Sequence, residues 1–160
     1  MSEVLESLNG LIIPLAGKPL LVPNVSVAEL VAYRLSQSAS SGPEWFLGWT
    51  LWRDQQIPMI DLDVMLAEGA EPGADAQPRT LILNALEGVP NLSFMGVRVW
   101  GIPRARRLTR DEVEQVGDGD GGSYILQRVQ VADEAGELLI PDLPAMEQAL
   151  QQSGLLRRTA

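Results

Sequence analysis

The chain has 160 residues, of which 46% are hydrophobic and 21% are charged, and it contains neither cysteine nor histidine. Without these two residue types there can be no disulfide, no thiolate metal site and no imidazole general base or zinc ligand. The net charge of −9 opposes binding to nucleic acid or to an anionic membrane surface. The composition therefore argues against most enzyme classes and predicts neither a cofactor nor a metal.

A chain of this length can form one domain, residues 1–160, with a core that needs no covalent staples. The segment 67–78 is rich in alanine, glycine, proline and acids, so it is expected to be a loop that joins two halves, 11–66 and 79–153. The first apolar run follows an acidic leader and is broken at Pro14, which argues against a secretory signal. We expect a soluble cytoplasmic protein with no direct membrane insertion, because no run approaches the ~20 apolar residues of a membrane span.

The first elements are predicted to be strands. Short apolar runs at 11–15 and 19–22 flank Ala16-Gly17-Lys18, which is typical of a hairpin. Residues 25–35 are expected to form a third strand, and the polar segment 36–42 a loop.

The segment Pro43–Leu62, PEWFLGWTLWRDQQIPMIDL, is the most informative part of the chain. We expect a helical turn over 44–48, a strand over 48–52, a turn at 53–55, a returning strand over 56–62 and a helical turn over 62–66. Trp49 and Trp52 are three positions apart, so in a strand their side chains point to opposite faces, and one must point away from the surface on which the other packs. An exposed tryptophan beside Arg53 would have the composition of an interaction hot spot.

The second half is also predicted to be mainly β. Strands are expected over 80–86, 92–102, 123–132 and 137–140, the last two forming a hairpin around 133–136. Many short strands at this spacing predict a barrel or a sandwich.

Two helices are expected in this half. Thr109 and Glu112 have the spacing of a capping box, and Leu108 with Val113 forms the matching staple, so a short helix is predicted over 108–117. A final helix is expected to begin at Asp142, with Pro144 in its first turn, and to end at Gly154.

Three polar features are interpreted structurally. The loop 118–122 fails the calcium-loop template at its sixth and twelfth positions, so it is interpreted as a hairpin tip. The basic run could dock an acidic partner, but balance by nearby acids is favoured; it comprises Arg104, Arg106, Arg107 and Arg110. Asp61 and Asp63 could perform acid–base chemistry, but they are interpreted as caps at a strand end.

Several motifs in this order resemble a known family. They are Val27-Ala28-Glu29-Leu30, then Pro43–Gly48, then the Arg-tipped hairpin, then Ile57-Pro58-Met59-Ile60-Asp61-Leu62, with Val99-Trp100-Gly101-Ile102 and residues 137–143 continuing the pattern. Over residues 11–150 the chain resembles the CheW-like adaptor domain of bacterial chemosensory systems. Within that family it looks most similar to ChpC-like adaptors of type IV pilus clusters, which control twitching motility.

The resemblance implies a mainly β fold of two small five-stranded, SH3- or OB-like barrels that share a core, with a few short helices and a C-terminal helix. It implies a non-enzymatic adaptor whose partners are the regulatory domain of a CheA-type histidine kinase and the cytoplasmic tip of a methyl-accepting chemoreceptor. It places the partner-binding residues at Val27, Glu29, Trp52, Arg53 and Asp54, with Val27 on the same strand face as Glu29.

The chain departs from the family pattern at three positions. Leu51 stands where the family usually has asparagine, Asp54 where it has glycine, and Val97 where it often has aspartate. The hairpin tip is therefore expected to be stiffer and more acidic than usual, which bears on the choice of receptor and kinase.

Two alternatives belong to other function classes. A small-ligand or oligosaccharide-binding β-barrel could use Trp45, Trp49 and Trp52 as stacking platforms. A carboxylate-based hydrolase would need two acidic groups that face each other across a pocket.

Overall fold

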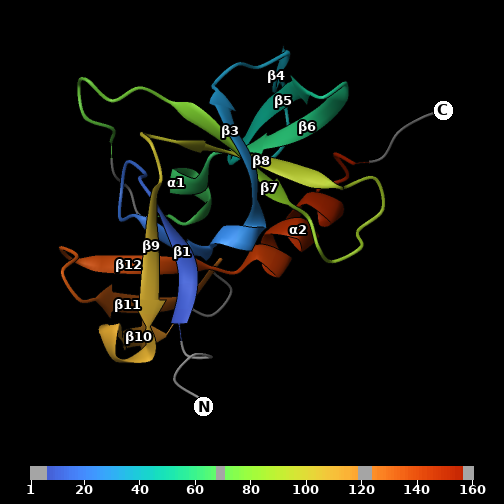
Figure 1. Cartoon of the computed structure of the whole chain (residues 1–160). Helices are drawn as coiled ribbons and strands as arrows, with labels where there is room; N and C mark the ends of the chain where they lie inside the picture. Colours follow the sequence, from blue (N-terminus) through green and yellow to red (C-terminus); the bar gives the residue numbers. More distant parts are fainter. Residues whose placement is uncertain (1–6, 68–70, 119–123, 157–160) are drawn as a thin grey trace.

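The computed structural model describes residues 7–67, 71–118 and 124–156, which form two six-stranded sheets (Figure 1). The first sheet has the order β10-β11-β12-β2-β1-β9. Its strands are β1 (Ser7–Ile13), β2 (Leu20–Pro23), β9 (Arg104–Thr109), β10 (Val113–Asp118), β11 (Ile125–Val131) and β12 (Glu137–Pro141).

The second sheet has the order β3-β7-β8-β6-β5-β4. Its strands are β3 (Val27–Ala32), β4 (Gln37–Ser38), β5 (Phe46–Trp52), β6 (Gln55–Ile60), β7 (Arg79–Asn84) and β8 (Phe94–Val99). The helices are α1 (Leu62–Met65) and α2 (Leu143–Gln152), with short 3-10 turns η2 (Asn24–Ser26) and η3 (Arg110–Glu112).

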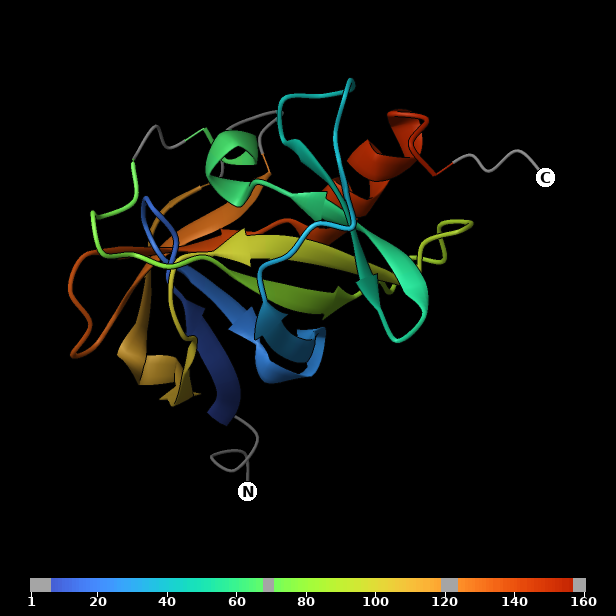
Figure 2. The ribbon, with the colours of Figure 1, turned by 90° about the horizontal axis from the view of Figure 1, so that it is seen from above.

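Both sheets are strongly curved. In each sheet the two end strands follow each other in the chain: η3 joins β9 to β10, and residues 33–36 join β3 to β4. A short connection between end strands requires the sheet to curl back on itself, which gives two barrel-like halves, here called the first barrel and the second barrel (Figures 1 and 2). The predicted mainly β, two-barrel fold is confirmed, with six strands instead of five in each sheet.

The barrels do not coincide with the two halves of the sequence. The first barrel takes β1 and β2 from before the loop 67–78 and its other four strands from after it. Long-range pairing of β1 with β9, and a parallel contact of Leu20 with Leu139, hold these distant segments together.

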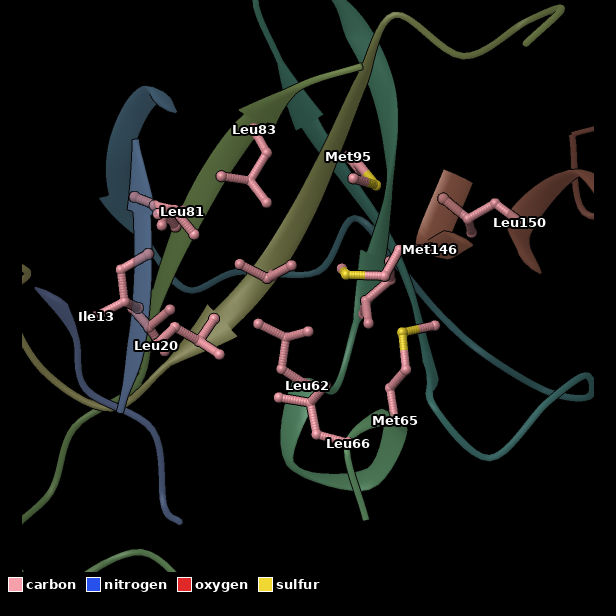
Figure 3. Close-up of a cluster of buried hydrophobic side chains, with 14 of the residues drawn as sticks. Ile13, Leu20, Leu62, Met65, Leu66, Leu81, Leu83, Met95, Met146 and Leu150 are labelled. Carbon is pink, nitrogen blue, oxygen red and sulfur yellow. The ribbon is translucent and has the colours of Figure 1, made fainter. Parts of the chain in front are cut away.

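The hydrophobic core has three parts, because consecutive strand residues point to opposite faces. Leu20 and Val22 enter a central cluster between the barrels, whereas Leu21 points into the first barrel. Both helices also bury residues in the central cluster, including Leu62, Met65, Met146 and Leu150 (Figure 3). The interior of the second barrel contains Trp52, Ile57 and Ile82.

Local signals place several elements as predicted. The Asp61 carboxylate accepts a hydrogen bond from the N–H of Val64 and caps α1, while Asp142 caps α2 with Pro144 in the first turn. The hairpins between β1 and β2, β5 and β6, and β11 and β12 are all present.

The predicted helix over 108–117 is wrong. Its capping box does form between Thr109 and Glu112, but the helical turn stops after three residues and the chain continues as β10. Val113 pairs with Val131 of β11 and packs against the interior of the first barrel, so sheet pairing overrides the local helix signal.

Smaller differences occur at other segment ends. The predicted strand 25–35 is the 3-10 turn η2 followed by β3, and the loop 36–42 contains the two-residue strand β4. The chain turns at 44–45 and already enters β5 at Phe46. Of the loop considered for calcium, residues 119–122 lie outside the described residues.

Candidate protein-interaction site

The β5–β6 hairpin has a tight two-residue tip. Trp52 pairs with Gln55, which leaves Arg53 and Asp54 as the loop, with φ of 50° and 64°. Two consecutive residues with positive φ are typical of a type I′ turn, whose twist matches the flanking strands. The tip is therefore a defined turn that projects the Arg53 side chain, which is 68% exposed, into solvent.

Glu29 of β3 lies beside this tip. Its Oε1 accepts a hydrogen bond from Trp52 Nε1 at 2.9 Å and lies 3.4 Å from Arg53 Nη2. The two residues named by the family resemblance, Glu29 and Arg53, therefore form an ion pair, although they are far apart in the chain.

Trp52 is buried, so the condition of an exposed tryptophan beside Arg53 is not met. It is 7% exposed and packs with Ile57 and Ile82 inside the second barrel. Its ring meets Phe94 edge-on, with centroids 4.8 Å apart. As predicted, Trp49 and Trp52 point to opposite faces of the strand, because Trp49 packs against the central cluster.

Trp52 also contacts Arg53 directly. The guanidinium carbon of Arg53 lies 4.6 Å from the centroid of the Trp52 ring, a cation–π distance. Glu29 and Arg53, which both contact Trp52, and Asp54, the next residue of the tip, form the surface here called the tip patch.

Val27 lies on the opposite face from the tip patch. It pairs with Leu83 of the central cluster, whereas Glu29 pairs with Ile82 of the second-barrel interior, with a register shift between the two pairs. The prediction that Val27 and Glu29 share one face is therefore wrong, because a bulge reverses the alternation of side chains. Val27 packs partly buried against the central cluster.

Asp54 is exposed and lines a shallow hollow of about 330 Å³ beside the tip. Amide and hydroxyl side chains make up much of its wall, contributed by Gln55, Gln56, Asn91 and Ser93. The tip patch thus continues into a polar surface that can form hydrogen bonds with a partner.

The other acidic candidates are held by structural contacts. Asp61 Oδ2 accepts a hydrogen bond from Arg98 Nη2 at 2.8 Å, and the Asp63 carboxylate accepts the N–H groups of Ala16 and Gly17. Asp61 and Asp63 do line a hollow of about 420 Å³, but their oxygens bind protein groups, which disfavours the hydrolase hypothesis.

Two arginines of the basic run, Arg104 and Arg106, are balanced by acids, as favoured from the sequence. Glu134 binds both Arg104 and Arg106, and Glu112 binds Arg106. The hydrogen bond from Arg104 and the neighbouring Arg106 lower the pKa of Glu134, whereas backbone and hydroxyl hydrogen bonds from Thr109 lower the pKa of Glu112. These contacts form an ion-pair network on the first barrel, away from the tip patch.

The tryptophans do not form a ligand platform. Trp45 and Trp49 pack against the central cluster, and Trp49 meets the Phe46 ring edge-on at 5.7 Å. Since Trp52 is inside the second barrel, the three rings are engaged in separate packing contacts. The ligand-binding barrel hypothesis is therefore not favoured.

The structure also bears on metal binding and membrane crossing. Within residues 7–67, 71–118 and 124–156 there is no group of three or more acidic side chains placed to hold a metal ion. Among the same residues, neither α1 nor α2 is long and apolar enough to cross a membrane.

Sequence reasoning missed the role of Arg98. This residue pairs with Thr80 across β7 and β8, and its guanidinium lies 5.0 Å from the centroid of the Trp100 ring while it binds Asp61. The sequence feature that could have indicated this role is the position of an arginine between two apolar residues of a predicted strand.

The role of Glu147 in α2 was missed as well. Glu147 is 2% exposed, and its carboxylate accepts hydrogen bonds from the N–H groups of Leu86 and Glu87. An acid on the apolar stripe of α2, next to Met146, was the available signal.

Comparison with known proteins identifies the family of the chain and supports its fold. Residues 9–150 match the model of the CheW-like domain family. The chain belongs to this family. The CheW-like chain is similar in structure to the scaffolding protein TtCheW from Thermoanaerobacter tengcongensis, with a TM-score of 0.66 at 18% identity. The match covers 85% of this chain and 84% of that one, and it confirms the fold. None of the curated proteins matches the chain.

Proposed function

We propose that this CheW-like protein is a non-enzymatic cytoplasmic adaptor that couples chemoreceptors to a CheA-type histidine kinase. Its partners are the cytoplasmic tip of a methyl-accepting receptor and the regulatory domain of the kinase. Membership of the CheW-like family supports a scaffold role in chemotaxis signalling. On the residue pattern alone, we further propose the ChpC-like subtype, which acts in twitching motility driven by type IV pili.

The observation that carries the proposal is the tip patch. It places Glu29 and the exposed Arg53 in contact at the end of a tight hairpin, beside the exposed Asp54. An exposed ion pair of this kind contributes only ~0.2–1 kcal/mol to folding. An arginine at the centre of a protein interface can contribute ~2 kcal/mol or more to binding. The patch is thus better suited to partner recognition than to stabilising the fold.

The adaptor role requires no chemistry of its own. A scaffold works by holding two partners in a fixed geometry, and modest interfaces become strong when many copies act together in an array. A chain without histidine or cysteine is compatible with this role.

The test is Arg53→Glu, with binding to the kinase regulatory domain and to a receptor-tip fragment measured by calorimetry. We expect at least one of the two dissociation constants to rise roughly 30-fold, which corresponds to ~2 kcal/mol, while the melting curve stays nearly unchanged. Arg107→Glu is the matched control, since Arg107 is also exposed but lies on β9 of the first barrel. Equal binding by both variants and the wild-type protein would refute the role of the tip patch.

A further inference from the structure

Trp52 occupies an unusual place between the core and the tip patch. Its ring is buried with Ile57 and Ile82, yet its indole N–H reaches Glu29 and one ring face reaches Arg53 of the patch. We propose that Trp52 is a positioning residue, which holds Glu29 and Arg53 ready to receive a carboxylate of the partner protein. This inference rests on the proposed function, because it concerns the same surface.

The first step is that Trp52 itself is fixed. Ile57 and Ile82 are 2% and 0% exposed around its side chain, and Phe94 meets its ring at 70° between planes. A large side chain confined in this way keeps one rotamer, because interiors are close-packed. The indole N–H therefore has a fixed direction before any partner binds.

The second step is that Trp52 holds Glu29. The 2.9 Å bond from Trp52 Nε1 to Glu29 Oε1 is shorter than the 3.4 Å separation of Arg53 Nη2 from the same oxygen. Exposed ion pairs between two long side chains order them weakly. A hydrogen bond from a buried donor restricts the carboxylate more, so the indole is the main restraint on Glu29.

The third step is that Trp52 orients Arg53. The guanidinium lies over the ring at 4.6 Å, and one of its nitrogens contacts Glu29, so its position is set from two sides. A guanidinium carries five N–H donors in one plane, and a carboxylate binds two of them along one edge. Because the Arg53 side chain is 68% exposed, donors remain accessible to a partner.

The chemistry of the patch defines the partner group. Arg53 offers hydrogen-bond donors for a carboxylate, while the neighbouring Glu29 and Asp54 favour donors or cations next to it. The partner surface that fits is an aspartate or glutamate flanked by an amide or basic side chain.

The test combines Trp52→Phe with Glu29→Gln and Arg53→Gln. Phenylalanine keeps an aromatic ring in the barrel but removes the N–H donor. We expect the affinity for the partner identified with Arg53→Glu to fall roughly fivefold in Trp52→Phe. In a protein that already carries Glu29→Gln and Arg53→Gln, Trp52→Phe should lower the affinity for the partner by less than about twofold, because the two charged groups that Trp52 positions are absent. An equal loss in both backgrounds would mean a merely structural role and would overturn the inference.

Two further measurements keep the result interpretable. Trp49→Phe is the matched control, since it removes an indole from the same strand but away from the patch, and its affinity should equal that of wild type. In the free protein, the Trp52 indole N–H resonance should exchange slowly with solvent and shift in Glu29→Gln. A resonance that exchanges fast and ignores Glu29→Gln would overturn the inference even if Trp52→Phe unfolds.

The outcomes separate the two proposals. If Arg53→Glu weakens binding but Trp52→Phe does not, the adaptor site stands and the positioning role fails. If Arg53→Glu leaves binding to both partners unchanged, the proposed site fails, and the indole resonance alone then decides whether Trp52 restrains Glu29.

Discussion

The Asp63 carboxylate accepts a hydrogen bond from the N–H of Gly17 at 2.9 Å, and this contact joins the two barrels. Gly17 lies in the β1–β2 turn of the first barrel, whereas Asp63 belongs to α1, which follows the last strand of the β5–β6 hairpin. The second carboxylate oxygen accepts the N–H of Ala16 at 3.2 Å. A single side chain thus satisfies two backbone donors of a loop that is distant in sequence.

Removing this contact is expected to loosen the β1–β2 turn. Asp63→Ala should lower the free energy of unfolding by about 1–3 kcal/mol, because two backbone donors lose their protein acceptor. Amide hydrogen exchange at Ala16 and Gly17 should accelerate more than exchange at Val64 of α1. Asp63→Asn, which retains one oxygen acceptor, should fall between Asp63→Ala and wild type. Unchanged exchange at Gly17 in Asp63→Ala would show that other contacts hold the turn.

Loss of the buried Glu147 carboxylate should lower the free energy of unfolding more than loss of the Asp63 carboxylate. Glu147→Ala leaves the N–H groups of Leu86 and Glu87 without their acceptor at a site that is 2% exposed. We expect a loss of about 2–3 kcal/mol of stability, measured by urea unfolding, and rapid exchange of both amides. Gln151→Ala is the matched control, because it shortens a polar side chain at an exposed position of the same helix. An equal effect of both changes would contradict this account.

Gly48 is required by the close approach of β4 to β5. Its φ is 132°, and a Cβ added there would collide with the carbonyl oxygen of Gln37 and lie 2.9 Å from the N of Ala39. Both contacts are with backbone, so Gly48→Ala should destabilise the fold by about 2 kcal/mol or more, measured as a shift in the unfolding midpoint.

Gly136 provides the matched control for that substitution. It also has a positive φ, of 73°, but an added Cβ would meet nothing within 4 Å. Gly136→Ala should therefore cost only the conformational strain, about 1 kcal/mol. Similar midpoints for the two variants would rule out the clash at β4 as the dominant effect.

The ion-pair network on the first barrel, together with the pair between Lys18 and Glu137, predicts a loss of stability in acid. The pKa values of Glu112, Glu134 and Glu137 all lie below their ordinary value of 4.5, with Lys18 as the main cause at Glu137. Because the unfolded chain then binds more protons, the contribution of these carboxylates is present above about pH 4.5 and is lost as the pH falls through their folded pKa values.

Glu134→Gln tests this dependence. We expect its melting temperature to lie below that of wild type at neutral pH, and the difference to shrink between about pH 5 and pH 3. Glu114→Gln, on an exposed position of β10, should follow the wild-type curve. A difference between Glu134→Gln and wild type that grows toward acid pH would have the wrong sign for this mechanism.

Much of the fold was predictable from short segments. The Arg53–Asp54 tip, the cap at Asp142 and the alternation of apolar residues along the strands depend on residues that are neighbours in the chain. The motifs around Glu29 and Arg53 also identified the family, which the match over residues 9–150 confirms.

The errors have a common cause. The capping box at Thr109 predicted a helix, but the pairing of Val113 with Val131 in the first barrel turned the chain into a strand. The alternation rule placed Val27 with Glu29, but a bulge against β7 separated them. In both cases a partner strand that is distant in sequence determined the local conformation.

The sequence by itself determined the mainly β class, the hairpins, the family and the residues Glu29 and Arg53 of the tip patch, because each depends on composition or on nearby residues. Tertiary structure alone decided which strands share a barrel, that Trp52 is buried, and that its indole meets Glu29. These features depend on pairings across long stretches of chain, and the free energy of such pairings is set by packing that no short segment contains.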